Sequence, residues 1–147
     1  MLRTELTHPD ILAVVARAGH HATILIADGN YPASSKKGPN AAVISMNLSP
    51  GVVTCNQTLA ALLSVVPVEA AHVMQTEADG PYALDGDPEV WTDYRQTIAD
   101  SGHDLQLSEV DKWGFYEKVE TPDHVLTIQT ADQQRYANIL LTVGVRM

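Results

Sequence analysis

The sequence predicts a layered α/β fold in one domain, and three observations support this prediction. The chain has 147 residues, of which 45% are hydrophobic, so one domain with a buried core can form. Short apolar runs rich in β-branched residues alternate with segments of helical periodicity. No internal repeat and no low-complexity tract interrupts this alternation. Strands that alternate with helices are typical of a sheet covered by helices.

The first helix and the first strand are predicted before residue 28. Thr7 can cap the helix, Pro9 suits its first turn, and Asp10 favours the positive end of the helix dipole. Gly19 fits a left-handed stop at the other end. Residues 23–27, Thr-Ile-Leu-Ile-Ala, are apolar, β-branched and too few for a helix, which predicts a buried central strand.

The middle of the chain repeats the alternation. Residues 28–40 are rich in Gly, Asn, Pro, Ser and Lys, which predicts a loop, and residues 41–46 form the next apolar run. Thr54 and Gln57 have the spacing of a capping box, which predicts the start of a second helix. A third strand is predicted over 68–75.

The second half of the chain is predicted in the same way. The segment Asp87-Pro88-Glu89 has the chemistry of a helix start, and Gly102 suits the end of that helix. The remaining elements are a short strand over 104–108, a short helix over 111–118, and closing strands over 125–130 and 138–145.

The composition of the chain excludes several classes of partner. Its 18 acidic and 9 basic residues give a net charge of −9, which would repel a nucleic acid duplex or an anionic membrane. The aromatic content of 5% leaves few platforms for stacking single strands. Cys55 is the only cysteine, and no stretch resembles a signal core or a membrane span. We therefore expect a cytoplasmic protein with no nucleic acid and no membrane partner.

Two polar residues flank the predicted central strand. His20 precedes it, and an imidazole, with an ordinary pKa of about 6.5, suits acid–base chemistry near neutral pH. The alternative is that His20 only stabilises the negative end of the first helix. Asp28 follows the strand at its carboxyl end, where ligands of open α/β sheets bind. The alternative for Asp28 is an Asx-turn with Gly29 and Asn30.

A second polar group, Tyr136-Ala137-Asn138, lies just before the last apolar run. Tyr136 and Asn138 alternate at the predicted start of a strand, so both are expected to project to one face. An Asn side chain offers a donor and an acceptor, which matches a pair of ligand hydroxyls. The alternative is one satisfied polar pair in an ordinary strand. We favour a ligand contact because the residues that follow are plain core.

The order and spacing of these residues resemble the RbsD/FucU family of sugar-anomer isomerases, the D-ribose pyranases and L-fucose mutarotases. That family has a Gly-His pair, an Asp eight residues after the His, and a late Tyr-(Ala/Gly)-Asn. The matching residues here are Gly19-His20, Asp28, Tyr136-Ala137-Asn138 and, as in the mutarotase branch, Phe115-Tyr116-Glu117. The resemblance implies one domain over 1–147, a three-layer α/β/α sandwich with a largely parallel or mixed sheet.

The resemblance also implies a role for individual residues. His20 matches the proton donor of the family and is expected to be the catalytic acid/base. Lys112 matches a sugar-contacting position that is Arg in mutarotases and His in pyranases; it keeps a positive donor but loses the planar fork. The alternative for Lys112 is a solvated side chain beside Asp111. The substrate contacts implied are Asp28, Lys112, Tyr136, Ala137 and Asn138.

The resulting prediction is a sugar mutarotase that opens and recloses the ring of a free aldose. Phe115-Tyr116-Glu117 favours L-fucose or a related 6-deoxy sugar, whereas Ala137 is more like the ribose branch, so the sugar stays open. No cofactor is expected, because there is no phosphate-binding or dinucleotide fingerprint. No metal is expected either, because the spacing of His20, His21, Asp28 and His72 fits no usual ligand pattern. The alternatives are a non-catalytic monosaccharide-binding accessory protein of an uptake system and a purely structural ring-forming domain.

His20 and Asp28 are separated by the predicted strand, which spans roughly 25 Å with its flanks. Either the loop before the strand folds back, or the site combines groups from neighbouring subunits. The resembling enzymes form closed rings with sites next to subunit boundaries. The apolar segment 139–145 ends the chain and is expected to be a sheet edge that a neighbour covers. We therefore expect a homo-oligomeric ring larger than a dimer.

Overall fold

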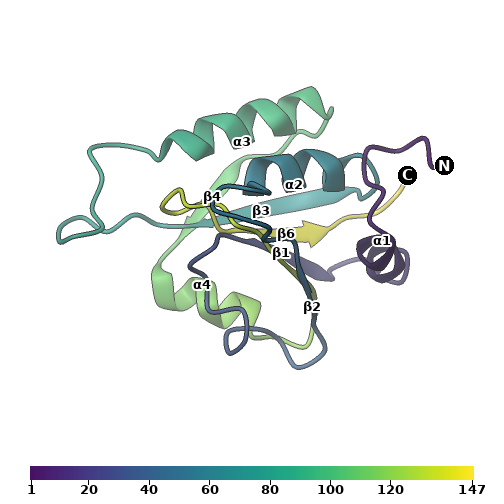
Figure 1. Ribbon diagram of the computed structural model, residues 1–147, viewed down its shortest axis with the longest axis horizontal. Helices are drawn as coiled ribbons and strands as arrows, with labels where there is room; N and C mark the ends of the chain where they lie inside the picture. Colours follow the sequence, from purple (N-terminus) through teal and green to yellow (C-terminus); the bar gives the residue numbers. More distant parts are fainter.

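The computed structural model describes residues 1–147 and contains one six-stranded sheet and four helices (Figure 1). Every predicted helix and strand is present, which confirms the α/β class. None of the four helices combines the length and the apolar character that crossing a membrane requires. In chain order the elements are α1 (Pro9–Val15), β1 (Thr23–Ala27), β2 (Ala42–Ser45), α2 (Cys55–Leu63), β3 (Val68–Met74), α3 (Glu89–Asp100), β4 (Leu107–Val110), α4 (Lys112–Val119), β5 (His124–Gln129) and β6 (Ile139–Val143).

The sheet is mixed, with the strand order β2-β5-β1-β6-β3-β4. Strand β6 runs antiparallel to both of its neighbours, whereas the other five strands are parallel to one another. The prediction that the last strand forms an edge is therefore wrong. Its apolar run Ile139–Leu141 is buried on both faces of the sheet, as a central strand requires, and the edges are β2 and β4.

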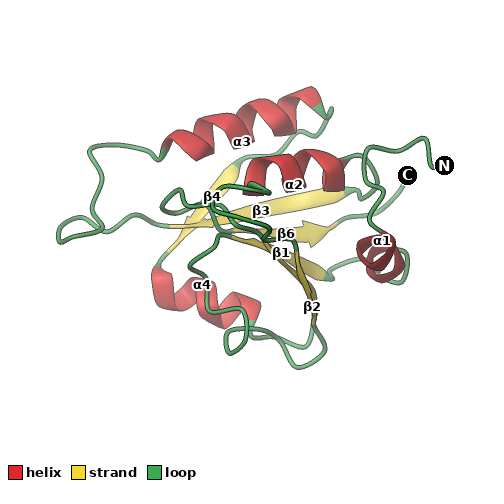
Figure 2. Cartoon of the chain, in the orientation of Figure 1, coloured by secondary structure: helices red, strands yellow, loops and turns green.

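Helices cover both faces of the sheet. Figure 2 shows α2 and α3 together on one side and α4 on the other, which confirms the three-layer α/β/α arrangement. Strand β1 serves both layers: Ile24 and Ile26 belong to the larger core cluster with α2 and α3, and Leu25 and Ala27 belong to a smaller one with α4. This alternation explains why the whole run is apolar.

The helix starts agree with the predicted capping chemistry at α2 but not at α1, and the start of α3 at Pro88 has no side-chain cap. The capping box of α2 is complete, because the Thr54 hydroxyl accepts from the Gln57 amide and the Gln57 side chain accepts from the Thr54 amide. Helix α4 is capped by the Asp111 carboxylate. Helix α1 is capped by His8 instead of Thr7, since His8 Nδ1 accepts from the Ile11 amide at 3.4 Å.

The short strand β4 lies three residues later than predicted, at Leu107–Val110, because its pairing with the carboxyl half of β3 fixes its position. The five parallel strands end at one edge of the sheet, which we call the carboxyl edge. Strand β6 starts at this same edge because it runs the other way. The opposite edge, where β1 and β3 begin and β6 ends, is called the amino edge.

Candidate functional site

A cavity of about 500 Å³ opens at the carboxyl edge of the sheet. Ligands of open α/β sheets favour this edge. Four of the five predicted substrate contacts line the cavity: Asp28, Lys112, Tyr136 and Asn138. The rest of its lining comes from the loop after β1, the end of β3 and the segment beyond it, α4, and the loop before β6: Asn30, Tyr31, Pro32, Met74, Gln75, Glu77, Tyr82, Tyr116 and Arg135.

Asp28 and Asn138 hold each other in fixed positions. The Asp28 amide donates to Asn138 Oδ1 at 2.8 Å, and Asn138 Nδ2 donates to Asp28 Oδ2 at 2.9 Å. The Asn30 amide donates to Asp28 Oδ1 at 2.9 Å, which completes the predicted Asx-turn. Both alternatives considered for Asp28 are therefore compatible, because the turn orients the carboxylate at the cavity. Each amide atom of Asn138 keeps further hydrogen-bonding capacity for a ligand.

Asp28 is the lining group whose pKa is shifted toward neutrality. Its residue is only 6% exposed, and this burial raises the pKa of the carboxyl to about 6, with the charge of Asp132 adding to the rise. The hydrogen bonds from the Asn30 and Tyr31 amides and from Asn138 act in the opposite direction and keep the rise moderate. A carboxyl with a pKa near neutrality can both take and give a proton under physiological conditions.

Tyr136 shapes the cavity through its backbone as well as its phenol. Its φ of 60° lies in the left-handed region, so it is not part of a regular strand. The indole of Trp91 donates to the Tyr136 carbonyl at 3.0 Å, and the Tyr94 hydroxyl donates to the Ala137 carbonyl. These contacts from α3 hold the turn that aims Tyr136 and Asn138 into the cavity. The expectation that both residues project from a strand is wrong, although both reach the same space.

The phenol of Tyr136 fixes the segment beyond β3. Its hydroxyl donates to the Tyr82 carbonyl at 2.8 Å and accepts from the Glu77 amide at 3.0 Å. Ala137 itself does not line the cavity, because it is fully buried within the larger core cluster. The residue expected to touch the substrate thus lies behind the site.

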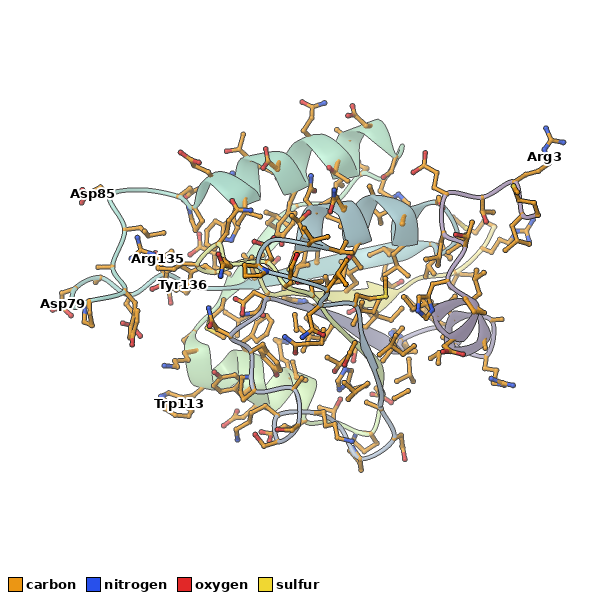
Figure 3. All side chains as sticks on the ribbon, in the orientation of Figure 1. Arg3, Asp79, Asp85, Trp113, Arg135 and Tyr136 are labelled. Carbon is orange, nitrogen blue, oxygen red and sulfur yellow. The ribbon has the colours of Figure 1, made fainter.

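Charged side chains stand at the rim. Lys112 is the first residue of α4; its Nζ lies 4.0 Å from Glu77 Oε1 and 5.8 Å from the centre of the Trp113 ring. Arg135 also reaches the rim, and its Nη1 donates to the Ala83 carbonyl at 3.3 Å. Figure 3 shows Trp113, Arg135 and Tyr136 at one end of the molecule, far from Arg3 near the amino terminus.

One wall of the cavity is aromatic and apolar. Tyr31 and Tyr116 have ring centres 5.8 Å apart and line the cavity together with Met74. The Tyr31 hydroxyl donates to the Lys36 carbonyl at 2.8 Å. Burial raises the pKa of this phenol above its ordinary value, so it stays a neutral donor. Phe115 is fully buried behind this wall.

His20 lies at the amino edge, outside the cavity. It precedes β1, whereas Asp28 follows the same strand, so the strand separates the two side chains. His20 Nε2 lies 3.0 Å from Glu69 Oε2, and His21 Nδ1 lies 3.4 Å from Glu69 Oε1. The loop before β1 therefore does not fold back to bring His20 to Asp28 within one chain.

Sequence reasoning missed several residues of both regions. Glu69 is the partner of His20, and Glu77, Tyr82 and Arg135 line the cavity. Arg135 directly precedes the Tyr136-Ala137-Asn138 motif, so its position in the sequence could have indicated that it lies at the site. Glu69 had no local signal, because its contact with His20 depends on β6 lying between β1 and β3.

Comparison with known proteins identifies the family. A family model described as the RbsD / FucU transport protein family matches residues 1–146. The chain belongs to the RbsD/FucU family. The fucose mutarotase of Homo sapiens is 30% identical over 148 residues, which cover 95% of this chain and 90% of the human protein. The fucose mutarotase of Danio rerio is 28% identical over 144 residues, covering 93% and 88% of the two chains.

Solved structures of family members have the same fold. The fucose mutarotase of Streptococcus pneumoniae, solved in complex with L-fucose, has a TM-score of 0.80 and 26% identity, with 100% of each chain covered. RbsD of Bacillus subtilis, solved with D-ribose, has a TM-score of 0.78 over 100% of each chain. At 20% identity this second likeness concerns the fold alone.

Proposed function

We propose that this chain is a sugar mutarotase that interconverts the anomers of a free aldose, with L-fucose as the best candidate. The observation that carries the proposal is Asp28, held by Asn138 at the cavity with a pKa of about 6. Membership of the RbsD/FucU family and the likeness to fucose mutarotases support the same chemistry.

The reaction needs two proton transfers. Opening a pyranose removes the proton of the anomeric hydroxyl, breaks the bond between C1 and the ring oxygen, and protonates that oxygen, which leaves an aldehyde and a hydroxyl. Rotation about the C1–C2 bond and reclosure with the reverse transfers give the other anomer. In our account the Asp28 carboxylate takes the anomeric proton and the His20 imidazole supplies the proton to the ring oxygen.

The two proton-transfer groups are proposed to come from neighbouring chains. They lie at opposite edges of one sheet, so one chain cannot present both to one sugar. If the amino edge of one chain meets the cavity of the next, each site receives His20 from a neighbour. Such a contact joins two different surfaces, and its repetition closes into a ring. We therefore propose a homo-oligomer larger than a dimer, which light scattering at micromolar concentration would detect and a fully active monomer would contradict.

Glu69 is proposed to position His20. Its two carboxylate oxygens lie 3.1 and 3.0 Å from His20 Nε2, so an Nε2–H can donate to either. This contact orients the ring and leaves Nδ1 to face the neighbouring cavity. Glu69 thus acts through His20, and a Glu69→Gln substitution would retain a hydrogen bond to it.

The lining supports a 6-deoxy sugar as substrate. Tyr31, Tyr116 and Met74 form an apolar wall that suits the methyl group of L-fucose, and most of the other lining residues are polar. Lys112 is proposed to hold a sugar hydroxyl at the rim. A reducing compartment, the cytoplasm, is proposed from the one free thiol, which is buried.

Saturation-transfer NMR on a panel of L-fucose, D-ribose and common aldoses tests the proposed function. Accelerated exchange between anomer signals, fastest for L-fucose, is the expected result. Binding of the sugar without faster exchange would favour the accessory binding protein. No binding in a thermal-shift screen over the same panel would favour a structural role.

A further inference from the structure

Three side chains that ligate metals meet at the amino edge: His20, His21 and Glu69. We call them the His–Glu cluster. Their ligating atoms all lie within 4.8 Å of one another. His20 Nε2 is 3.0 Å from Glu69 Oε2, and His21 Nδ1 is 3.4 Å from Glu69 Oε1. All three residues are exposed in the isolated chain.

The backbone at His21 creates this arrangement. Adjacent side chains on an extended chain point to opposite sides. His21 instead has a φ of 70°, in the left-handed region, and its ring stacks on the His20 ring with the centres 3.7 Å apart. The turn is held where the His21 amide donates to the Val143 carbonyl at 3.0 Å and the Ala22 amide to the Gly19 carbonyl at 3.1 Å. A conformation that costs free energy thus directs both imidazoles at one carboxylate.

We propose that the His–Glu cluster binds a divalent transition-metal ion of the Zn²⁺ type. Zn²⁺ sits about 2.0–2.2 Å from imidazole nitrogen and carboxylate oxygen, so tetrahedral ligand atoms stand roughly 3.4 Å apart. The nitrogen–oxygen distances in the cluster, 3.0 to 3.4 Å, already approach this spacing. Two imidazoles and one carboxylate suit Zn²⁺ and disfavour Mg²⁺ and Ca²⁺, which prefer oxygen ligands alone. A fourth position stays open to water.

The ion would inhibit the enzyme reversibly, and this consequence rests on the proposed function. A metal bound to His20 Nε2 replaces the proton that Nε2 donates to Glu69, so Glu69 no longer positions the ring. His20 can then no longer deliver a proton to the sugar, whereas Asp28 of the same chain lies at the opposite edge and is not a ligand of the ion.

Calorimetric titration of the metal-stripped full-length protein with ZnCl₂ tests the site without reference to activity. One Zn²⁺ per chain is expected. Substituting a residue that only supports a metal ligand lowers metal affinity about 10–100-fold. Substituting a ligand itself, as in His21→Asn or Glu69→Gln, should therefore weaken Zn²⁺ binding at least tenfold. Asn is chosen at 21 because it tolerates the left-handed conformation. The matched control is His103→Ala, a histidine whose one hydrogen bond is to Ser101, and it should bind Zn²⁺ as the wild type does.

Anomer exchange measured with and without ZnCl₂ tests the consequence. Wild-type exchange should fall with Zn²⁺ and return with EDTA, and His21→Asn should exchange normally but resist Zn²⁺. No stoichiometric binding, or unchanged binding in both cluster variants, would overturn the site. Binding without inhibition would overturn the inhibitory role. If neither the wild type nor any variant exchanged anomers in the absence of Zn²⁺, the proposed function would be contradicted. The calorimetric titration would still show whether the His–Glu cluster binds Zn²⁺.

Discussion

The two edges of the sheet hold their ionisable groups in opposite ways. At the carboxyl edge, Asp28 is 6% exposed, fixed by three hydrogen bonds, and has a pKa raised to about 6 by burial. At the amino edge, His20, His21 and Glu69 are exposed and contact one another. Asp28 therefore has its acidity set within the chain, whereas His20 lies outside the cavity, and its proposed role in catalysis requires the cavity of a neighbouring chain.

The edges share one feature, a non-glycine residue with left-handed backbone. His21 has a φ of 70° at the amino edge, and Tyr136 has a φ of 60° beside the cavity. Each such residue costs about 1–3 kcal/mol and persists only where its surroundings hold it. Both are held by hydrogen bonds from other elements. His21 and Tyr136 are the non-glycine residues with positive φ, and they lie at the two edges that the proposed mechanism uses.

The largest effect is expected from His20→Ala. The rate of anomer exchange should fall by about 10²–10⁴-fold, the usual worth of a general acid, while the melting temperature stays nearly unchanged because the side chain is exposed. His21→Asn is the matched control and should keep its exchange rate. Normal exchange in His20→Ala together with a collapse in His21→Asn would mean that the other histidine carries the chemistry.

The pH profile tests Asp28. As a base it must be ionised, so the acidic limb of kcat/KM for L-fucose should rise with pH through an apparent pKa of about 6. Exchange is measured by NMR after subtraction of the uncatalysed rate. The rising limb should disappear in Asp28→Asn, which should also be slow at every pH. A wild-type profile that is flat across this range would remove Asp28 from the role of base.

Asn138→Ala should shift the pH profile of kcat/KM to higher pH and lower the free energy of unfolding. The substitution removes the donor to Asp28 Oδ2 and leaves the buried Asp28 amide without an acceptor, at a cost of about 1–3 kcal/mol in the free energy of unfolding. Losing a hydrogen bond to the ionised carboxylate raises its pKa further, so the limb should shift to higher pH. Denaturant unfolding and the NMR profile measure both effects. An unshifted limb would show that Asn138 does not set the acidity of Asp28.

The smallest effect is expected from Tyr136→Phe. The substitution removes a hydroxyl that accepts a hydrogen bond from the Glu77 amide and donates one to the Tyr82 carbonyl. Each of these hydrogen bonds contributes about 0.5–1.5 kcal/mol to stability. The backbone and its left-handed turn should persist, because Trp91 still holds the carbonyl. Exchange of the Glu77 amide hydrogen with solvent should accelerate. In the enzyme assay, KM should rise with little change in kcat. Unchanged exchange at Glu77 would mean that the phenol does not hold this segment.

Local chemistry was sufficient to predict most elements. The capping box at Thr54 and Gln57 and the apolar run 23–27 depend on nearby residues, and both formed as expected. The placement of β6 was not predictable in this way. A strand that ends the chain looks like an edge in the sequence, but strand order is set by pairing with β1 and β3, which are far away along the chain.

The candidate site was likewise predictable only where it depends on residues that are close together in the sequence. Asp28 and His20 were correctly expected at opposite ends of one strand, because strand length follows directly from the number of residues. Tyr136 was expected on a strand, whereas the aromatic residues of α3 hold it in a turn. Glu69 escaped notice because only the sheet brings it to His20.

Mixing two inactive variants tests the shared site most directly. His20→Ala and Asp28→Asn chains are unfolded together, refolded at equal concentration, and assayed for L-fucose exchange by saturation-transfer NMR. If each site takes His20 from one chain and Asp28 from the next, random assembly leaves about a quarter of the contacts with both native groups, so about a quarter of the wild-type rate should return. Variants refolded separately should stay inactive. A mixture as inactive as its components would contradict the shared site.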